Sequence, residues 1–325
     1  MELSLDELTF IEPVKESLQQ VEERLHSQAH GYHSAMAAAL EHLLSSGGKR
    51  IRPVLALLTG GMLGAESQKL VAMAAAIEML HTATLVHDDL IDGSLMRRGI
   101  PTLNTKWTSA ATVLTGDFLF ARAAKLAAET ESAPALNLFA QTLAIIVNGE
   151  ITQMFGVRGQ ADRADYNQRI YAKTASLFET STTATAIIAG SDVAIKEKVR
   201  VFGYEVGMAF QIVDDILDFT SQTQQLGKPV ASDLRQGLIT LPALYYIEEN
   251  PGDRDMLSVI DHDPCDEECL ERLLVAIRES GSIEKANNEA KQHIARALEA
   301  IKTLPDGTER TALMDLAYYI VRRNI

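Results

Sequence analysis

Two short stretches of this chain carry aspartates at the same spacing. The first is Asp88-Asp89-Leu90-Ile91-Asp92, and the second is Asp214-Asp215-Ile216-Leu217-Asp218. Both lie in apolar surroundings that predict helix, and side chains four residues apart share one face of a helix. Each motif therefore places its first and last carboxylates close together on one helix face.

Carboxylates on an apolar helix face repel one another and are costly to bury without a compensating cation. Hard oxygen ligands suit Mg²⁺, which is usually held by a few carboxylates, retained waters and substrate phosphates. A solvated acidic patch is the alternative interpretation of one such motif. Two copies flanked by Leu, Ile, Val and Phe favour a magnesium–diphosphate site.

Three basic segments could bind the phosphates of such a substrate. The segment Lys49-Arg50-Ile51-Arg52-Pro53 follows a Gly-Gly break, and a glycine turn before a helix N-terminus favours an oxyanion. Arg97-Arg98 follows the first aspartate motif, and arginine suits a forked grasp of phosphate. Lys173-Thr174 lies among apolar neighbours, where the lysine could be solvated or reach a phosphate. A basic surface loop is the alternative interpretation of the first segment.

Helices must position these residues, because helical spacing of apolar residues recurs and no strand-like alternation appears. Across 325 residues, ordinary helix lengths give roughly ten to fourteen helices. We predict an all-α fold in one domain, residues 1–325, with N-terminal helices at about 1–45 leading into the catalytic core. We also expect a turn at Gly116-Asp117 and a polar loop after the second aspartate motif.

Composition limits the classes of function. The 30 basic and 44 acidic residues give a net charge of -14, which argues against nucleic-acid binding. No uninterrupted apolar run approaches the length of a membrane-spanning helix, and the acidic N-terminal segment lacks a signal-peptide pattern. We therefore expect a cytoplasmic enzyme, with Cys265 and Cys269 as free thiols in a reducing compartment.

Taken together, these segments resemble the trans-isoprenyl diphosphate synthase (polyprenyl synthetase) family. The resemblance runs from about residue 40 to the C-terminus. Its ordered motifs are Gly48-Lys49-Arg50-Ile51-Arg52-Pro53, Asp88-Asp89-Leu90-Ile91-Asp92, Arg97-Arg98-Gly99, Lys173-Thr174, Phe210-Gln211-Ile212-Val213-Asp214-Asp215-Ile216-Leu217-Asp218 and Gly227-Lys228-Pro229. Either aspartate motif alone is moderately specific, whereas the ordered set is very specific.

The resemblance implies a single large helical bundle of the isoprenoid synthase type around a deep central cavity. The two aspartate motifs would face each other at the mouth of this cavity. It also implies a homodimer that condenses isopentenyl diphosphate head-to-tail with an allylic diphosphate. The chain would thus be a Mg²⁺-dependent prenyltransferase.

The resemblance also assigns roles by motif position. Three Mg²⁺ ions grip the allylic diphosphate, and the implied metal set is Asp88, Asp92, Asp214 and Asp218, the last acting through water together with Asp215. The implied ligands of the allylic diphosphate are Arg97, Lys173 and Lys228. Those of isopentenyl diphosphate are Lys49, Arg52, His81 and Arg98. Gln211 and Thr174 line the cation, and the implied catalytic set is Asp88, Asp92, Asp214, Lys173 and Gln211.

The chemistry follows from these parts. Bound Mg²⁺ neutralises the leaving diphosphate as the allylic C–O bond breaks, and a dry apolar cavity keeps water away from the cation. The double bond of isopentenyl diphosphate then attacks and a proton leaves. Because we see no side-chain base near the motifs, the departing diphosphate is the expected proton acceptor.

Product length should depend on the helix that carries the first aspartate motif, because the growing chain must run along it. In the family, bulky aromatics four or five residues before the motif give short products, whereas here Ala83 and Thr84 are small. Leu80, Met79 and Ile77 lie a turn or more deeper. We predict a long all-trans polyprenyl diphosphate for a quinone tail, with possible peripheral membrane contact during product release. Close helix packing is the alternative reason for the small residues.

Other functions remain in view. A shorter geranylgeranyl or farnesyl product is the first alternative. A class I terpene cyclase would not need the basic site for a second diphosphate, and a non-catalytic synthase subunit should have lost its aspartate motifs. A helical scaffold with acidic patches is the last alternative.

Two departures from the family pattern, Ala231 for the usual Gly and Leu238 for a Lys or polar residue, affect the loop after the second motif.

Overall fold

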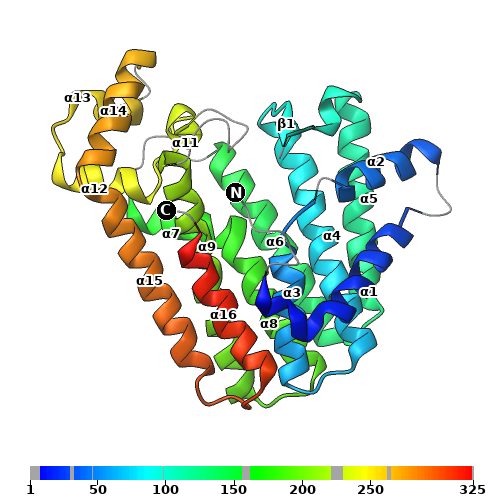
Figure 1. The fold of residues 1–325 in the computed structure, drawn as a ribbon. Helices are drawn as coiled ribbons and strands as arrows, with labels where there is room; N and C mark the ends of the chain where they lie inside the picture. Colours follow the sequence, from blue (N-terminus) through cyan, green and yellow to red (C-terminus); the bar gives the residue numbers. More distant parts are fainter. Residues whose placement is uncertain are drawn as a thin grey trace. The chain divides into compact units, whose positions relative to one another are not determined.

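The structure, a computed structural model, describes residues 8–29, 33–45, 47–97, 99–155, 162–220, 230–261 and 265–323. Within these residues the chain is almost entirely helical, with one pair of two-residue strands (Figure 1). The predicted all-α fold class is therefore confirmed. The chain divides into two compact units, the first Met1–Leu143, Leu177–Gly203 and Ala300–Leu316, the second Ala144–Ser176, Tyr204–Glu299 and Ala317–Ile325.

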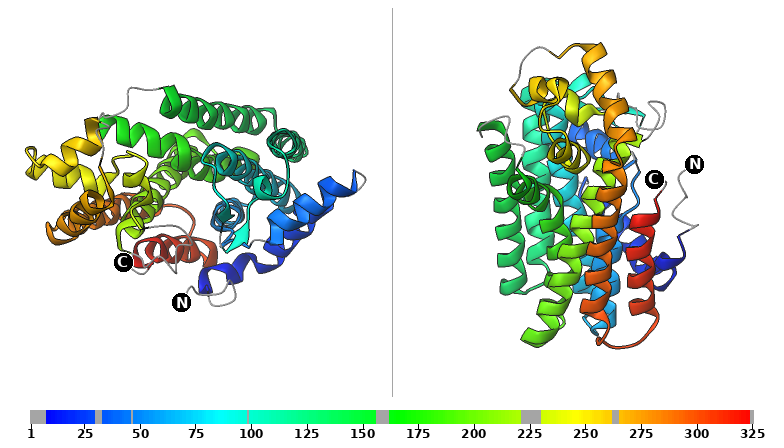
Figure 2. Two further views of the ribbon diagram at one scale, coloured as in Figure 1. Left: turned by 90° about the horizontal axis from the view of Figure 1, so that it is seen from above. Right: turned by 90° about the vertical axis from the view of Figure 1, so that its left-hand side faces the viewer.

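The first unit is built around helix α4 (Ser67–Ile91). Helix α4 packs against α1 (Lys15–Ser27), α3 (Ile51–Met62) and α5 (Ser109–Ala128), and it runs beside α5 in Figures 1 and 2. The other elements with residues in this unit are the short helices η2 (Thr9–Val14) and η3 (Leu103–Thr105), the helices α2 (Ser34–Ser45), α6 (Ala133–Phe155), α8 (Ser176–Ile188), α9 (Val193–Thr220), α15 (Ser282–Ile301) and α16 (Thr308–Arg322), and the strands β1 (Met96–Arg97) and β2 (Ile100–Pro101).

Helix α4 is the core helix of the first unit. Residues 70–80 are buried without interruption, because neighbouring helices cover the Ala-rich and Leu-rich turns on every side. Among the described helices it is the one that is long and apolar enough to cross a membrane, but most of that span is buried within the protein. We therefore interpret its apolarity as core packing that fixes the direction in which the helix ends.

Helix α5 shows that the turn predicted at Gly116-Asp117 is wrong. Both residues lie inside this helix, whose N-cap Thr108 accepts a hydrogen bond from the Ala111 N–H at 3.3 Å. A Cβ atom at position 116 would collide with the ring of His87 on α4. The glycine is present because two helices approach closely, which local sequence cannot distinguish from a turn.

The second unit shares helices α6, α9, α15 and α16, and the first residue of α8, with the first unit. Its remaining elements are α7 (Arg163–Ile170), the π-helical turn η4 (Tyr171–Ala175), α11 (Ser232–Arg235), α12 (Leu241–Glu249), α13 (Arg254–Asp261) and α14 (Glu267–Glu279). Glu289 on α15 ties several of these together, because it accepts hydrogen bonds from Arg163 at 2.6 Å and Tyr245 at 2.6 Å. These contacts hold α7 and α12 against α15.

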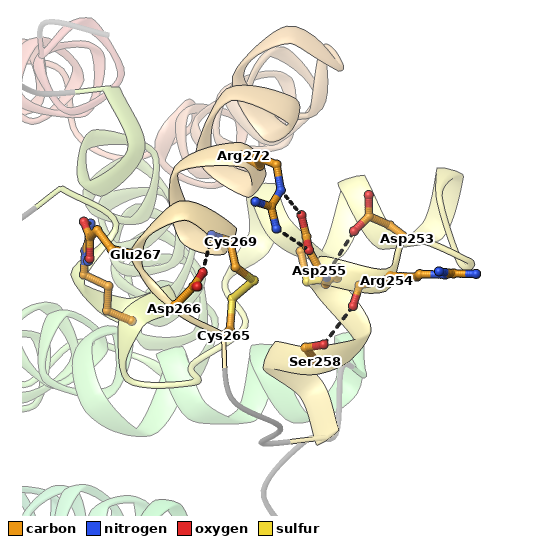
Figure 3. Close-up of a disulfide and its surroundings, with 11 residues drawn as sticks. Asp253, Arg254, Asp255, Ser258, Cys265, Asp266, Glu267, Cys269 and Arg272 are labelled. Carbon is orange, nitrogen blue, oxygen red and sulfur yellow. Dashed lines mark hydrogen bonds and ion pairs between the residues drawn. A yellow bond between two sulfur atoms is a disulfide. The ribbon is translucent and has the colours of Figure 1, made fainter.

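The two cysteines form a disulfide, so the prediction of free thiols is wrong (Figure 3). Cys265 precedes α14 and Cys269 lies in its first turn, with their Cα atoms 5.4 Å apart, in the usual range for a disulfide. Asp266 is the N-cap between them and accepts the Cys269 N–H at 2.9 Å. Cys265 lies just outside the helix and Cys269 in its first turn, so the pairing depends on how the chain enters α14, which an argument from cell compartment ignores.

Candidate active site

The first aspartate motif ends helix α4. Asp88 and Asp89 lie in its last turn, and Asp92 is its C-cap, whose N–H donates to the Asp88 carbonyl at 2.8 Å. Carboxylates here face the negative end of the helix dipole, and no basic residue lies in this turn. Asp88 is half-buried and Asp92 is exposed, so a cation could reach both carboxylates and relieve the unfavourable arrangement.

Asp89 has a different environment from its neighbours. It is buried and accepts a hydrogen bond at 2.8 Å from Nε of Arg97, on the β1–β2 hairpin that follows α4. Burial raises the pKa of the Asp89 carboxyl. The Arg97 guanidinium acts to lower this pKa, and the nearby charge of Asp92 acts to raise it further. Arg97, a predicted diphosphate ligand, is thus held beside the aspartate motif, and Arg98 lies outside the described residues.

Three of the four residues predicted to bind isopentenyl diphosphate lie on α4 and on the turn that leads into α3. Lys49 and Arg52 are half-buried at the start of α3, and the Arg52 guanidinium carbon lies 4.8 Å from the Phe178 ring centroid. His81 is half-buried on α4, about 10.5 Å along the helix before Asp88. The first unit therefore brings the α3 turn and α4 together, as a shared anion site requires.

The predicted chain-length residues lie on the same helix. Leu80 and Ala83 are fully buried, whereas Thr84 is half-buried. The Thr84 hydroxyl donates to the His81 carbonyl at 2.8 Å, so it is satisfied within the helix. Because this hydrogen bond lies within α4, replacing Thr84 with a larger residue would break no hydrogen bond from its hydroxyl to another helix.

The second aspartate motif ends helix α9, again without a basic residue in the last turn. Asp214 is the more accessible of its outer pair, with 39% of its side chain exposed, and pairs with Arg323 at 3.0 Å. Asp218 is buried, and its two oxygens accept the Ser232 hydroxyl at 2.9 Å and the Asp233 N–H at 3.1 Å. Asp218 therefore caps the short helix α11, a structural task that the sequence did not indicate.

The middle aspartate of this motif belongs to a buried chain of hydrogen bonds. Asp215 accepts the Tyr166 hydroxyl at 2.7 Å and the Gln211 side-chain N–H at 2.8 Å. The Gln211 carbonyl oxygen accepts the Thr174 hydroxyl at 2.6 Å. Burial and the nearby Asp215 carboxylate raise the pKa of Tyr166, so its hydroxyl stays protonated and donates. This chain of hydrogen bonds fixes both predicted cation-lining residues, Gln211 and Thr174. The sequence did not indicate the role of Tyr166, because nothing in its local sequence links it to Asp215.

Lys173 lies in the π-helical turn η4, and such turns are frequent at functional sites. Its side chain is 41% exposed, with Nζ 3.4 Å from Glu150. Lys173 thus stands next to Thr174 on a locally widened helix and can reach out of it. The other lysine predicted for this diphosphate, Lys228, lies outside the described residues, as do Gly227 and Pro229.

The loop that departs from the family pattern follows the second motif. Ala231 is buried and is the N-cap of α11, in the left-handed region at φ 54°. A residue with a Cβ pays about 1–2 kcal/mol for this conformation, which explains why a glycine suits the position. The Leu238 N–H donates to the Asp233 carbonyl at 2.9 Å, so the backbone there closes the loop without the usual polar side chain.

The donor set fits Mg²⁺ in chemistry but is incomplete without a substrate. Within the described ranges, no three His, Cys, Asp or Glu side chains gather closely enough to hold a metal by themselves. Mg²⁺ is usually held by one or two carboxylates together with substrate phosphates and water. The pair Asp88 and Asp92, and separately Asp214, suit that mode of binding.

The described chain is all-α, and its two aspartate motifs end two long helices, the first of them bound by Arg97 of the following hairpin. Comparison with known proteins assigns the family. The model of the Polyprenyl synthetase family matches residues 33–277. The chain therefore belongs to the polyprenyl synthetase family of prenyltransferases.

Individual relatives agree with this assignment. The octaprenyl diphosphate synthase of Haemophilus influenzae is 38% identical over 285 residues, 87% of each chain. Heptaprenyl diphosphate synthase component 2 of Bacillus subtilis is 37% identical over 304 residues, 93% of this chain and 87% of the relative. A crystal structure of polyprenyl synthase from Caulobacter crescentus, complexed with calcium and isoprenyl diphosphate, has a TM-score of 0.92 at 35% identity, covering 99% of this chain and 98% of that one.

Proposed function

We propose that this chain is a Mg²⁺-dependent synthase that condenses isopentenyl diphosphate head-to-tail with an allylic diphosphate to give a long all-trans polyprenyl diphosphate. The observation that carries the proposal is the placement of both aspartate motifs at helix C-termini that lack any basic residue. Such a placement breaks the usual rule of helix electrostatics, and violations of local rules are expected at functional sites. The calcium bound in the complex of the Caulobacter relative supports a divalent cation.

In the first unit, Asp88 and Asp92 would hold the metal, which would supply Lewis-acid stabilisation of the leaving diphosphate. Arg97, held by Asp89, would grasp the allylic diphosphate on the hairpin side of α4. Lys49 and Arg52 would bind isopentenyl diphosphate together with His81. Arg98 would complete this site by its motif position.

In the second unit, Asp214 would offer a carboxylate to Mg²⁺, and Asp218 would support it through water. Lys173 and Lys228 would bind the allylic diphosphate. The Gln211 amide turns its N–H₂ group toward Asp215. The Gln211 carbonyl then lies beside the Thr174 hydroxyl, and this polar pair would line the developing cation.

The long product is supported by two observations. The relatives quoted above are named octaprenyl and heptaprenyl diphosphate synthases. In this chain the two positions before the first motif that would block a growing product are Ala83 and Thr84, which are small. Geranylgeranyl or farnesyl diphosphate remains the alternative product.

We infer that the partner is a second copy of this chain. Helix α6 carries an exposed apolar stripe at helical spacing, formed by Val147, Ile151, Met154 and Phe155, of which Phe155 is 82% exposed. A stripe of this kind typically marks an interface. The Bacillus relative is named as one component, so a different second chain is the alternative partner.

Two further expectations stay proposals. We propose a cytoplasmic location and, because a long polyprenyl chain is poorly soluble in water, a peripheral membrane contact during product release. The Cys265–Cys269 disulfide removes the support that free thiols would have given to a cytoplasmic location.

The proposal is tested with purified protein, Mg²⁺, labelled isopentenyl diphosphate and a set of allylic starters, with the products sized after dephosphorylation. A terpene cyclase would consume the starter without incorporating label, and a non-catalytic component would stay inactive until another chain is added. Either result would refute the proposed reaction for this chain.

Asp88→Ala and Asp214→Ala should each abolish turnover while leaving helical content unchanged, because the metal contributes several kcal/mol of charge stabilisation. As a second measurement, Mg²⁺ with inorganic diphosphate should protect the wild type, but neither variant, against thermal unfolding. Asp306→Ala is the matched control, since that carboxylate is 85% exposed and pairs only locally with Arg310. Near-normal turnover of either active-site variant at saturating Mg²⁺ would overturn the metal assignment.

A further inference from the structure

Arg50 lies in the middle of the basic turn, but its side chain does not share the environment of its neighbours. Lys49 and Arg52 are half-buried, whereas Arg50 is buried, with 8% of its surface exposed. A phosphate-binding arginine needs access to its ligand. The basic turn therefore contains one arginine that faces the protein interior.

The backbone at this position is strained. Arg50 is the N-cap of α3 and lies in the left-handed region at φ 46° and ψ 33°. Its carbonyl accepts the first hydrogen bond of the helix, from the Val54 N–H at 3.0 Å. A non-glycine residue pays about 1–2 kcal/mol for this conformation, so the side chain must provide compensating contacts.

Those contacts are two carboxylates on two other helices. The Arg50 Nη1 group donates to Glu78 on α4 at 2.9 Å, and its Nε group donates to Glu22 on α1 at 2.5 Å. Glu78 is itself buried, with 7% of its side chain exposed. The three helices α1, α3 and α4 lie together in Figure 1. Removing one partner of such a buried charge pair strongly destabilises the folded protein, because the other charge is left buried without compensation. Arg50 and Glu78 are therefore expected to stay in contact.

The anchor on α4 relates the two halves of the predicted isopentenyl diphosphate site. Glu78 precedes His81 by three residues, so the two lie on adjoining turns of one helix face. Arg50 is joined directly to Lys49 and is two residues from Arg52. The Arg50–Glu78 pair therefore fixes the distance between the basic turn and the helix that bears His81.

We propose that Arg50 is a positioning residue for isopentenyl diphosphate, which it does not touch. By clamping the left-handed turn to Glu78 and Glu22, it holds Lys49 and Arg52 at the spacing that the diphosphate needs against His81. This inference rests on the proposed function, because it assumes that these three residues bind isopentenyl diphosphate. A merely structural role for Arg50 would change stability without separating the two substrates.

The test compares Arg50→Lys, which keeps the charge but not the forked geometry, with Glu78→Gln, which removes the anchor and leaves the turn unchanged. Both variants should raise KM for isopentenyl diphosphate about tenfold, equivalent to about 1.4 kcal/mol, and change KM for the allylic substrate less than about twofold. Direct binding of isopentenyl diphosphate without an allylic substrate, measured by calorimetry, should weaken by the same factor.

One further variant serves as a control, and another separates the clamp from the backbone strain. Arg24→Lys alters another arginine of the first unit, which pairs with Glu129, and should leave both KM values unchanged. Arg50→Gly relieves the backbone strain but lacks the clamp, and should still weaken isopentenyl diphosphate binding. If Arg50→Lys does not fold, Glu78→Gln and Arg50→Gly give the result.

Equal changes in both KM values, or unchanged binding of isopentenyl diphosphate in folded variants, would overturn the positioning role. Failure of the proposed function is distinguishable, because the wild type itself would then neither bind nor incorporate isopentenyl diphosphate.

Discussion

The aspartates of the two motifs have unequal environments. Asp88, Asp92 and Asp214 are at least partly accessible, whereas Asp89, Asp215 and Asp218 are buried and bound to protein groups. A buried carboxylate that already accepts two hydrogen bonds has less capacity to coordinate an ion directly. Within each motif, part of the acidic charge thus builds the support for the carboxylates that would bind the metal.

Burial gives Asp215 an unusual titration. Burial and then repulsion by Asp233 raise its pKa to about 7, against the hydrogen bonds from Tyr166 and Gln211, and Asp214 adds a smaller repulsion. The carboxyl of the unfolded chain ionises near its ordinary pKa of 3.8. Between these values the folded protein holds a proton that the unfolded chain has lost. Stability is therefore greatest below the lower pKa and falls as the pH rises through the window.

We expect the free energy of unfolding of the metal-free wild type to fall by up to about 1.4 kcal/mol per pH unit in this window through Asp215 alone. Asp215→Asn should lack that contribution. Denaturant unfolding in the presence of a chelator, at intervals from pH 5 to pH 8, measures the difference between the two proteins. Tyr166→Phe is the matched variant, because losing a donor to the ionised form should extend the decline to higher pH. A difference that stays constant with pH would contradict this assignment.

At the scale of a single element, helix α4 carries most of the predicted machinery of the first unit. Along it lie the Glu78 anchor, His81, the chain-length positions 83 and 84, and the first aspartate motif. It is buried over much of its length, and residues along it are spaced by the regular rise of an α-helix, about 1.5 Å for each residue. The proposed anion site, product wall and metal carboxylates of the first unit would therefore all lie along one buried helix.

The chain-length prediction belongs to this helix. Thr84→Phe should shorten the product toward farnesyl diphosphate without preventing the first condensation, because an aromatic ring there would block the growing chain. Ala83→Phe should shorten it too, but Ala83 is fully buried and the added bulk should cost about 1–3 kcal/mol of stability. Thr84→Phe, at a half-buried site, separates the two effects.

Products are sized after dephosphorylation, and Leu85→Phe is the control because the next residue points about 100° away around the helix. A wild type that stops at fifteen carbons would refute the long-product assignment. Unchanged product length in both Ala83→Phe and Thr84→Phe would show that these small residues serve helix packing only.

At the scale of the whole molecule, the exposed stripe on α6 is the feature that an isolated chain does not explain. Its four apolar residues share one helix face within the second unit. Leaving such a face in water costs about 25 cal/mol for each Å² that a partner could cover. Association with a second copy would remove that cost.

Wild-type protein should therefore have twice the 35.5 kDa mass of one chain in solution. Ile151→Glu should shift it to the monomer, because a buried, unpaired carboxylate at the centre of the stripe disfavours association. Sedimentation velocity measures the masses, and Val193→Glu, at an isolated exposed apolar residue, is the control. A monomeric wild type that becomes active only when another protein is added would favour the two-component alternative.

Much of this protein was determined by its sequence alone. Helical periodicity predicted the all-α class, and the spacing of the two aspartate motifs predicted paired carboxylates at i and i+4. Together with the basic turn, Arg97-Arg98 and Lys173-Thr174, the two aspartate motifs identify the polyprenyl synthetase family from residue types and order alone. These features could be predicted because they depend on residue type and on separations of a few residues, which helix geometry converts directly into proximity.

Only the tertiary structure decided which members of each motif are buried and what they contact. Arg50 turns inward because Glu22 and Glu78, each 28 residues away, meet it there. Asp215 is bound by Tyr166 from 49 residues earlier, and position 116, inside α5, holds a glycine because the ring of His87 leaves no room for a Cβ atom. The Cys265–Cys269 disulfide likewise depends on where α14 begins. Burial and partner choice arise from packing between distant segments, and the local pattern around a residue does not contain that information.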